Sequence, residues 1–244
     1  MELKNQVVIV TGGAVRVGRQ ICLTLARRGA RLFCHYHTSE QAANSLAEEI
    51  TATGGEIRLF RGDLSRLEDV NRLVNEAYRV YGQVDALINN AAVFFKTPLG
   101  TVTEQQWDLF QQVNLKPVFF LSQEVGLRMK KRGQGKIINI ADAGAEAVFP
   151  AYIPYSVSKA GVLALTKGLA KALAPQVQVN CVNPGPVMIP EEMSPEERTY
   201  AIEQTLLKRE GSPLDVARTV RFLIEEGDYM TGAVIPVDGG RHIR

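Results

Sequence analysis

A tyrosine and a lysine four residues apart are the side chains of this sequence best suited to acid–base chemistry. They are Tyr155 and Lys159, in the stretch YSVSKAG. On a helix this spacing places both side chains on one face, one turn apart. A neighbouring ammonium favours tyrosinate, so Lys159 is expected to lower the pKa of the Tyr155 hydroxyl and make it a general acid near neutral pH. Alone, such a pair is also typical of an ordinary surface helix.

A glycine-rich turn far upstream makes a catalytic role for this pair a stronger prediction. The strand-like run at 7–10 is followed by TGGAVRVG, from Thr11 to Gly18, and then by a helical pattern. Gly12 permits a tight turn, Gly18 permits close approach of the backbone, and a helix N-terminus offers free N–H groups to a pyrophosphate. We therefore expect Gly12, Val17 and Gly18 to bind a dinucleotide.

The second strand-like run favours NADP over NAD. An NAD site places an acidic residue about 20 residues beyond the glycine turn, where it binds the ribose 2′-hydroxyl. Here that region reads HYHTS, with no acid before Glu40. Arg16 stands in a first helical turn, where the helix dipole opposes its charge unless an anion is bound. We therefore expect NADPH as the cofactor. The expected phosphate-side residues are Arg16, His35, Tyr36, His37 and Ser39.

Three further segments that follow strand-like runs complete the expected cofactor site. Asp63 can accept a hydrogen bond from an adenine amino group; its alternative role is to cap the next helix, which Ser65 could do equally well. The small residues after the fourth run let the backbone lie against the cofactor, and the PGPV segment after the sixth is expected to form a rigid turn beside a flat ring. The residues concerned are Asp63, Leu64, Asn90, Ala91, Pro184, Gly185 and Val187.

The elements that must position these residues alternate between strand and helix along the whole chain. This pattern predicts a single α/β domain over residues 1–244, with a doubly wound parallel sheet of about seven strands and helices on both faces. In such sheets ligands bind beyond the carboxyl ends of the strands. The expected strands are 7–10, 31–36, 56–61, 86–88, 136–140, 178–182 and 233–236, and helices begin near 16, 39, 66, 103, 155 and 212.

Composition narrows the class of protein. The chain has 244 residues and a net charge of +2, which does not indicate a nucleic-acid partner, and the basic run at 130–132 is typical of a helix C-terminus. No apolar stretch approaches the ~20 residues that span a membrane. Three scattered cysteines indicate reduced thiols and a cytoplasmic location. No metal is expected, because Cys34 points away from His35 and His37 on a strand.

Taken in order, these motifs resemble the short-chain dehydrogenase/reductase family over essentially the whole chain. The matching segments are the glycine turn, Asn89-Asn90-Ala91, Asn114, Tyr155 with Lys159, Pro184-Gly185 and VDGG at 237–240. The resemblance implies a Rossmann-like fold, hydride transfer with a nicotinamide cofactor, and usually a homotetramer. It also implies that Lys159 binds the nicotinamide ribose, and that Asn114 supports a water that returns a proton to Tyr155 through Lys159.

Two departures from the usual family pattern point to one branch. Arg16 replaces the glycine two residues before the last glycine of the turn, and Asp142 replaces the catalytic serine thirteen residues before the tyrosine. With the HYH run, these changes are similar to the pteridine reductases and the bacterial dihydromonapterin reductases. That branch implies that Phe94 stacks on a pterin and that Arg16, Asp142 and Tyr155 contact it. Ala92 stands where the branch commonly has a serine, which leaves the substrate details open.

The chemistry of an aspartate independently favours this branch. A serine hydroxyl can donate to a developing alkoxide, whereas an ionised carboxylate only accepts and repels an oxyanion. Asp142 therefore suits a substrate with N–H donors, although it could instead cap a turn or be protonated in place of serine. The expected function is NADPH-dependent reduction of a dihydropterin with Tyr155 as the proton donor. The alternatives are a 3-oxoacyl-carrier-protein or general carbonyl reductase, and a cofactor-bound regulatory protein without activity.

Two segments near the C-terminus are expected to border the substrate. Residues 188–210 are charged and contain a helix start at Ser194-Pro195. The resemblance implies that this insertion before the final helix covers the substrate as a mobile lid, although it could equally be a passive surface helix. The tail at 241–244 follows the last expected strand. In tetramers of the family such tails can reach the active site of a neighbouring subunit.

Overall fold

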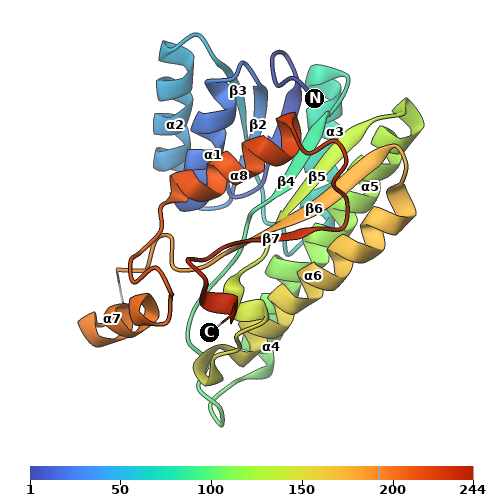
Figure 1. Cartoon of the computed structure of the whole chain (residues 1–244). Coiled ribbons are helices and arrows are strands. Elements are labelled where there is room, and N and C mark those ends of the chain that lie inside the picture. The colour runs from blue at the N-terminus through green and yellow to red at the C-terminus, as the bar shows by residue number, and fades with distance from the viewer. Residues whose placement is uncertain (192, 244) are drawn as a thin grey trace.

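The computed structural model describes residues 1–191 and 193–243, and in them one sheet of seven parallel strands forms the centre of the molecule (Figure 1). The strand order is β3-β2-β1-β4-β5-β6-β7. The order reverses between β1 and β4, and this switch point is where the carboxyl ends of the strands leave room for a ligand. The strands are β1 Val7–Val10, β2 Arg31–Tyr36, β3 Glu56–Arg61, β4 Ala86–Asn89, β5 Gly135–Ile140, β6 Val177–Pro184 and β7 Val234–Val237.

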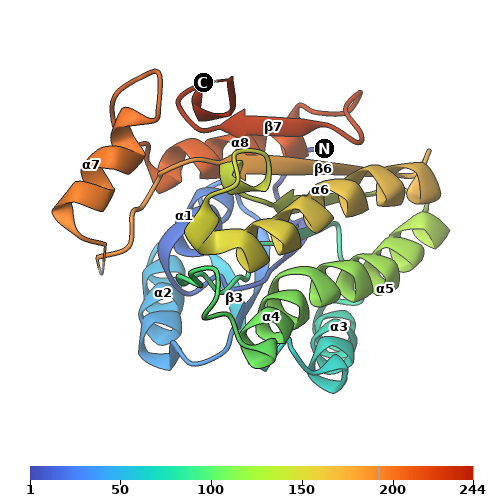
Figure 2. The same cartoon turned by 90° about the horizontal axis from the view of Figure 1, so that it is seen from below.

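Helices cover both faces of the sheet, as Figures 1 and 2 show. One apolar layer joins the sheet to α1, α2 and α8, and a second joins the opposite face to α3, α5 and α6. The helices are α1 Arg16–Ala26, α2 Glu40–Ala52, α3 Leu67–Tyr81, α4 Glu104–Phe110, α5 Lys116–Arg132, α6 Ile153–Leu173, α7 Pro195–Glu203 and α8 Pro213–Glu225.

The residues of β1 show why the sheet is buried on both sides. Val7 and Ile9 pack into the layer with α3 and α5, whereas Val8 and Val10 pack into the layer with α1 and α8. Successive side chains of a strand point to opposite faces, so a run of apolar residues serves two cores at once. The predicted doubly wound α/β fold is confirmed.

The expected helix near 103 is interrupted. It begins with a capping box at Thr103 and Gln106, but after α4 the chain makes a π turn over Gln111–Leu115 before α5. Pro117 has no N–H for the helical ladder, which accounts for the disturbance there. Lys130–Arg132 form the last turn of α5, as predicted. Among the described residues, no helix is long and apolar enough to cross a membrane.

Candidate active site

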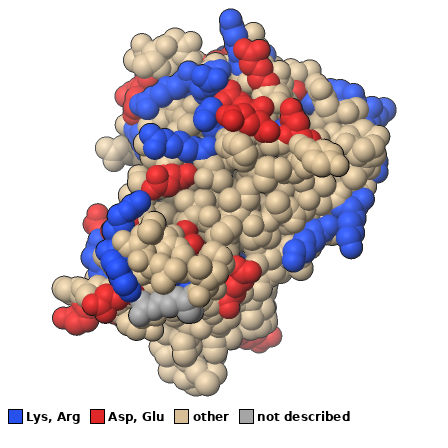
Figure 3. All heavy atoms as spheres, viewed as in Figure 1, with Lys and Arg blue, Asp and Glu red and all other residues tan. Residues whose placement is uncertain are grey.

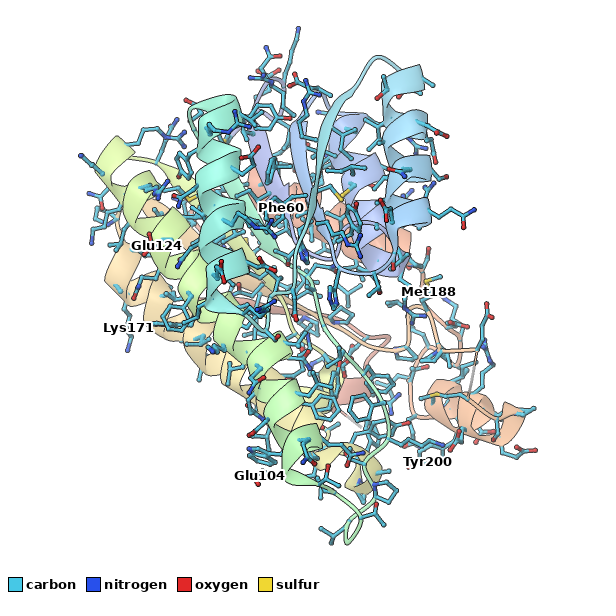
Figure 4. All side chains as sticks on the ribbon, turned by 180° about the vertical axis from the view of Figure 1, so that it is seen from behind. Phe60, Glu104, Glu124, Lys171, Met188 and Tyr200 are labelled. Carbon is cyan, nitrogen blue, oxygen red and sulfur yellow. The ribbon has the colours of Figure 1, made fainter. Side chains whose placement is uncertain are left out.

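A cavity of about 1060 Å³ opens at the carboxyl ends of the strands. Every site residue predicted from the sequence lines it, with the single exception of Asn114. The wall opposite the sheet is formed by α7 and its flanking segments, where Met188 and Tyr200 are labelled in Figure 4. The cavity is large enough for a dinucleotide together with a small substrate, because sites for single small ligands commonly occupy about 300–1,000 Å³.

The glycine turn is built for close backbone approach. Gly12 has a φ of +60°, and a side chain there would lie 2.9 Å from the Cα of Ala91. A Cβ on Gly18 would lie 2.1 Å from the carbonyl oxygen of Gly12. Asn90 donates from Nδ2 to the carbonyls of Thr11 and Gly12, at 2.9 and 3.0 Å. These contacts hold the turn against the end of β4 and leave the N-terminus of α1 open to a phosphate.

Arg16 occupies the position where the family usually has glycine, and its backbone shows the consequence. Its φ is +53°, in the left-handed region that costs a side-chain-bearing residue roughly 1–2 kcal/mol. The side chain is exposed at the cavity and donates to the carbonyl of Met188 at the edge of the lid segment. Arg16 therefore places a cation beside the helix N-terminus that is expected to hold the cofactor phosphates.

His35 does not have the role predicted for it. Its ring is buried, with Nδ1 accepting from the N–H of Gly12 at 3.1 Å and Nε2 donating to the carbonyl of Gly62 at 3.0 Å. Burial lowers the pKa of His35 to about 4. A neutral imidazole whose two nitrogens are both occupied cannot bind a 2′-phosphate. His37 is exposed on the cavity wall and remains available for that contact.

The depressed pKa of His35 predicts a loss of stability in mild acid. The unfolded chain takes up a proton on this histidine near pH 6.5, whereas the folded protein does so only near pH 4. The free energy of unfolding should therefore fall as the pH falls from 6.5 towards 4, by about 2 kcal/mol between pH 7 and pH 5. Urea unfolding of wild type and His35→Gln measures this.

The matched control for this experiment is His37→Gln, which removes the exposed neighbouring histidine. It should keep the wild-type pH dependence, whereas His35→Gln should flatten it. An equal slope in wild type and His35→Gln would contradict the assignment of the buried neutral state to His35.

At the centre of the cavity, Asp142 and Tyr155 form a hydrogen-bonded pair. The Tyr155 hydroxyl donates to Oδ2 of Asp142 at 3.0 Å, and the N–H of Gly144 donates to Oδ1 at 2.6 Å. Lys159 donates from Nζ to the carbonyl of Ile140 at 2.9 Å and is almost fully buried. The helical spacing of Tyr155 and Lys159 in α6 thus brings both to the end of β5, which bears Asp142 just beyond it.

The protonation states differ from the expectation that Lys159 acidifies Tyr155. Burial, and then the carboxylate of Asp142, raise the pKa of the Tyr155 hydroxyl well above 10. Burial also raises the pKa of Asp142 and lowers that of Lys159. The lysine Nζ lies 6.0 Å from the centre of the tyrosine ring and binds a backbone carbonyl instead of the hydroxyl. Burial first and the Asp142 carboxylate second therefore set the pKa of Tyr155, rather than Lys159.

Asn114 lies beneath the cavity wall in the π turn. Its side chain is buried, with Oδ1 accepting from the N–H of Val93 at 2.8 Å and Nδ2 donating to the carbonyl of Val93 at 3.0 Å and to Oγ of Ser158 at 3.2 Å. This amide therefore holds the loop that precedes Phe94. A role of Asn114 in proton return stays a prediction, and its side chain already has three partners.

Phe94 forms an aromatic wall beside the pair. Its ring stacks on Tyr152 with centroids 4.8 Å apart and an interplanar angle of 5°, and it meets Tyr155 edge-on at 4.8 Å. It is 41% exposed, so a planar ring has access to it. Such offset and edge-on arrangements are favourable for aromatic ligands.

Three contributors to the site were not predicted from the sequence. Thr11 accepts on Oγ1 from the N–H groups of Asn90 and Ala91, at 2.9 and 3.0 Å. Tyr152 supports Phe94, and Arg241 lines the cavity of its own chain, whereas the tail was expected to reach the site of a neighbouring subunit. The short spacing between Tyr152 and Tyr155 was a local signal that could have indicated Tyr152. The roles of Thr11 and Arg241 depend on contacts between distant segments.

Comparison with known proteins shows which family this fold and site belong to. The family model described as Enoyl-(Acyl carrier protein) reductase matches residues 13–242. A 3-oxoacyl-[acyl-carrier-protein] reductase FabG of Staphylococcus epidermidis is 34% identical over 243 residues, covering 98% of this chain and 100% of that protein. The 3-oxoacyl-[acyl-carrier-protein] reductase of Synechocystis is also 34% identical, covering 98% of this chain and 97% of that protein.

Solved structures give equally broad matches. FolM Alternative dihydrofolate reductase 1 from Brucella canis, complexed with NADP, has a TM-score of 0.92 and 31% identity, covering 100% of this chain and 96% of that one. A Serratia marcescens short-chain dehydrogenase/reductase mutant has a TM-score of 0.94 and 30% identity, covering 99% and 100%. A blue fluorescent protein from a metagenomic library, in complex with NADPH, has a TM-score of 0.92 and 33% identity, covering 99% of each chain.

The fold and the site define an oxidoreductase of the dinucleotide-binding α/β class. The chain belongs to the short-chain dehydrogenase/reductase family. The NADP and NADPH complexes among its structural neighbours agree with the cofactor predicted from the sequence. The curated relatives agree with the 3-oxoacyl-carrier-protein alternative rather than with the pteridine reductase branch, and that branch is not confirmed.

Proposed function

We propose that this protein is an NADPH-dependent reductase that acts on a C=N bond of a dihydropterin-type ring. The observation that supports this proposal best is the carboxylate of Asp142, hydrogen-bonded to Tyr155 at the position where the family usually has serine. The neighbouring structure of a dihydrofolate reductase, FolM, supports the same class of substrate.

The residues of the cavity fit the cofactor and the substrate. The open N-terminus of α1, Arg16 and His37 suit the phosphates of NADP(H), and NADPH supplies the hydride when bound. Phe94 offers its exposed ring to a flat substrate. Asp142 accepts from N–H groups of that substrate, whereas it would repel the oxyanion that forms when a ketone is reduced.

Tyr155 is the proposed proton donor to the ring nitrogen. Its hydroxyl is protonated at neutral pH, so the proton is present when the substrate binds, although the raised pKa makes it a weaker acid than a free phenol. Loss of that proton leaves a phenolate next to a carboxylate, and the ammonium of Lys159 compensates part of this charge. We propose that Tyr155 regains its proton through Lys159 and a water supported by Asn114 in the π turn.

A second candidate is reduction of 3-oxoacyl groups on acyl carrier protein, which the curated relatives favour. That function needs a basic surface for an acidic partner, and the cations that could form one lie near the end of α5: Arg128, Lys130, Lys131 and Arg132. There Arg128 donates to Asn75, Lys130 donates to the carbonyl of Ala172, and Arg132 pairs with Asp85 at 2.8 Å. Three of the four cations therefore have partners within the chain, while Lys131 is exposed, so this surface gives carrier-protein binding only partial support.

One assay separates the candidates. NADPH oxidation is followed with 7,8-dihydrobiopterin or dihydromonapterin, and in parallel with an acetoacetyl thioester. We expect kcat/KM to be at least about 100-fold higher for a dihydropterin, since a buried charged hydrogen bond is worth about 1.5–3 kcal/mol. We expect kcat/KM with NADPH to be about 10- to 100-fold higher than with NADH, because the 2′-phosphate also forms charged hydrogen bonds.

Each other outcome of this assay has a definite meaning. Preference for the thioester would replace the pterin proposal with the 3-oxoacyl one. Equal kcat/KM with NADH would contradict a 2′-phosphate site. Binding of NADPH without turnover of any substrate would favour a regulatory protein.

We also propose that the protein forms the homotetramer expected from its family. Figure 3 shows few charged side chains on the face that β7 and α6 share. Val157 in α6, Tyr229 before β7 and Ile243 after it are exposed apolar residues at 43%, 105% and 69%. The face with few charges and the exposed apolar side chains each support association with other copies.

A further inference from the structure

The C-terminal tail turns back into the cavity immediately after β7. Asp238 accepts from the N–H of Gly240 at 2.9 Å on one oxygen, and from the N–H and the ring of His242, both at 2.8 Å, on the other. Gly239 and Gly240 have φ values of +64° and +82°, which only glycine adopts freely. This tight turn directs Arg241 to the cavity of its own chain rather than outward.

Arg241 is held there by contacts with two separate segments. Its guanidinium carbon lies 4.4 Å from the centre of the Phe149 ring, and Nη1 donates to the carbonyl of Ala201 in α7 at 3.1 Å. Stacking leaves the edge of a guanidinium free, and the group has five N–H donors in a planar fork. Among residues 1–191 and 193–243, the backbone carbonyl of Ala201 is the only hydrogen-bond acceptor that the Arg241 side chain contacts.

Among residues 1–191 and 193–243, no acidic side chain forms an ion pair with Arg241, although Asp142 and Asp238 act on its charge electrostatically. Burial lowers the pKa of Arg241, but an arginine remains protonated in proteins, so a partly desolvated cation stays on the cavity wall. Two acids of α7 line the cavity: Glu197 is paired with Lys96, and Glu196 forms no ion pair with Arg241 in the described part of the chain.

From these contacts we infer that Arg241 is a specificity-determining residue that binds a carboxylate on the side chain of the substrate. The inference rests on the proposed function and extends it. Asp142 and Phe94 bind the ring, and Arg241, on the lid side of the same cavity, binds an anionic group that the ring bears, such as the glutamate of a dihydrofolate. A bidentate arginine–carboxylate contact is among the strongest polar contacts that a side chain makes.

Steady-state kinetics of Arg241→Gln and Arg241→Lys test this role with two substrates. One is 7,8-dihydrofolate, which has carboxylates, and the other is 7,8-dihydrobiopterin, which has none. Arg241→Gln should raise KM for dihydrofolate by about 10- to 100-fold while changing KM for dihydrobiopterin less than about 3-fold. Arg241→Lys should restore part of the loss, because it keeps the charge but not the fork.

The control variant is Arg198→Gln, which loosens the lid without touching the cavity. Arg198 joins α7 to Glu210 at 3.6 Å and does not line the cavity. If Arg241 only fastened the lid through Ala201, Arg241→Gln and Arg198→Gln would affect both substrates equally, and the inference would be wrong.

A binding experiment keeps the test valid even if pterins are not substrates. The wild-type protein loaded with NADP⁺ is titrated calorimetrically with 4-aminobenzoylglutamate and with its uncharged diamide. Wild type should bind the dicarboxylate at least about 10-fold more tightly, and Arg241→Gln should remove that preference. No preference in wild type would overturn the inference, whereas a preference without dihydropterin turnover would overturn the proposed function alone.

Discussion

Replacement of Tyr155 by phenylalanine is expected to lower kcat for dihydropterin reduction by about 10³-fold, because a positioned general acid contributes about 10²–10⁴. The substitution removes only the hydroxyl and its 3.0 Å bond to Asp142. The ring keeps its edge-on contacts with Phe94 at 4.8 Å and Phe110 at 6.0 Å, so the cavity wall should stay in place. The measurement is single-turnover oxidation of NADPH in the presence of saturating substrate.

Two further measurements distinguish loss of the proton donor from damage to the fold. The Kd for NADPH, measured by fluorescence, should change less than about 3-fold in Tyr155→Phe. Tyr200→Phe, which removes a hydroxyl from another tyrosine of the cavity, should leave kcat nearly unchanged. Full turnover by Tyr155→Phe would exclude this residue as the proton donor.

Replacement of Asp142 by asparagine is expected to lower kcat/KM for a dihydropterin by about 100-fold. The amide keeps the shape of the carboxyl group and can still accept from the N–H of Gly144. It loses the negative charge that accepts from N–H groups of the ring, and a charged hydrogen bond is worth about 1.5–3 kcal/mol. Asp142→Ser, which restores the usual residue of the family, should also raise activity on an acetoacetyl thioester relative to the dihydropterin.

Asp142→Asn should also change the dependence of kcat on pH. Burial and the Asp142 carboxylate together raise the pKa of Tyr155, so wild type should retain its protonated donor beyond pH 10. In Asp142→Asn the effect of burial remains and that of the charge disappears, so the alkaline decline should begin at lower pH. Unchanged kcat/KM and an unchanged alkaline limb in this variant would show that Asp142 only caps the turn at Gly144.

The fold could be predicted from the sequence because its signals are local. Apolar runs of strand length, alternating with helical spacing, require a sheet covered on both faces wherever they occur in a chain. The glycine turn and the spacing of Tyr155 and Lys159 are likewise readable within a few residues. The expected element ends agree with the structure to within two residues, and the π turn before α5 is the change to an expected element itself. Pro117 indicated where the helix would be disturbed, but not that the disturbance would be a π turn.

The types of the central side chains were also determined by the sequence alone: an acid at 142, a phenol at 155 and an ammonium at 159. Their protonation was decided by tertiary structure. Tyr155 binds a carboxylate from the end of β5, Lys159 binds a backbone carbonyl, and His35 is neutral between Gly12 and Gly62. A pKa depends on burial and on charges brought close by the fold, and neither can be read from neighbours along the chain. For the same reason, only the folded chain could bring Arg241 to the wall of the cavity.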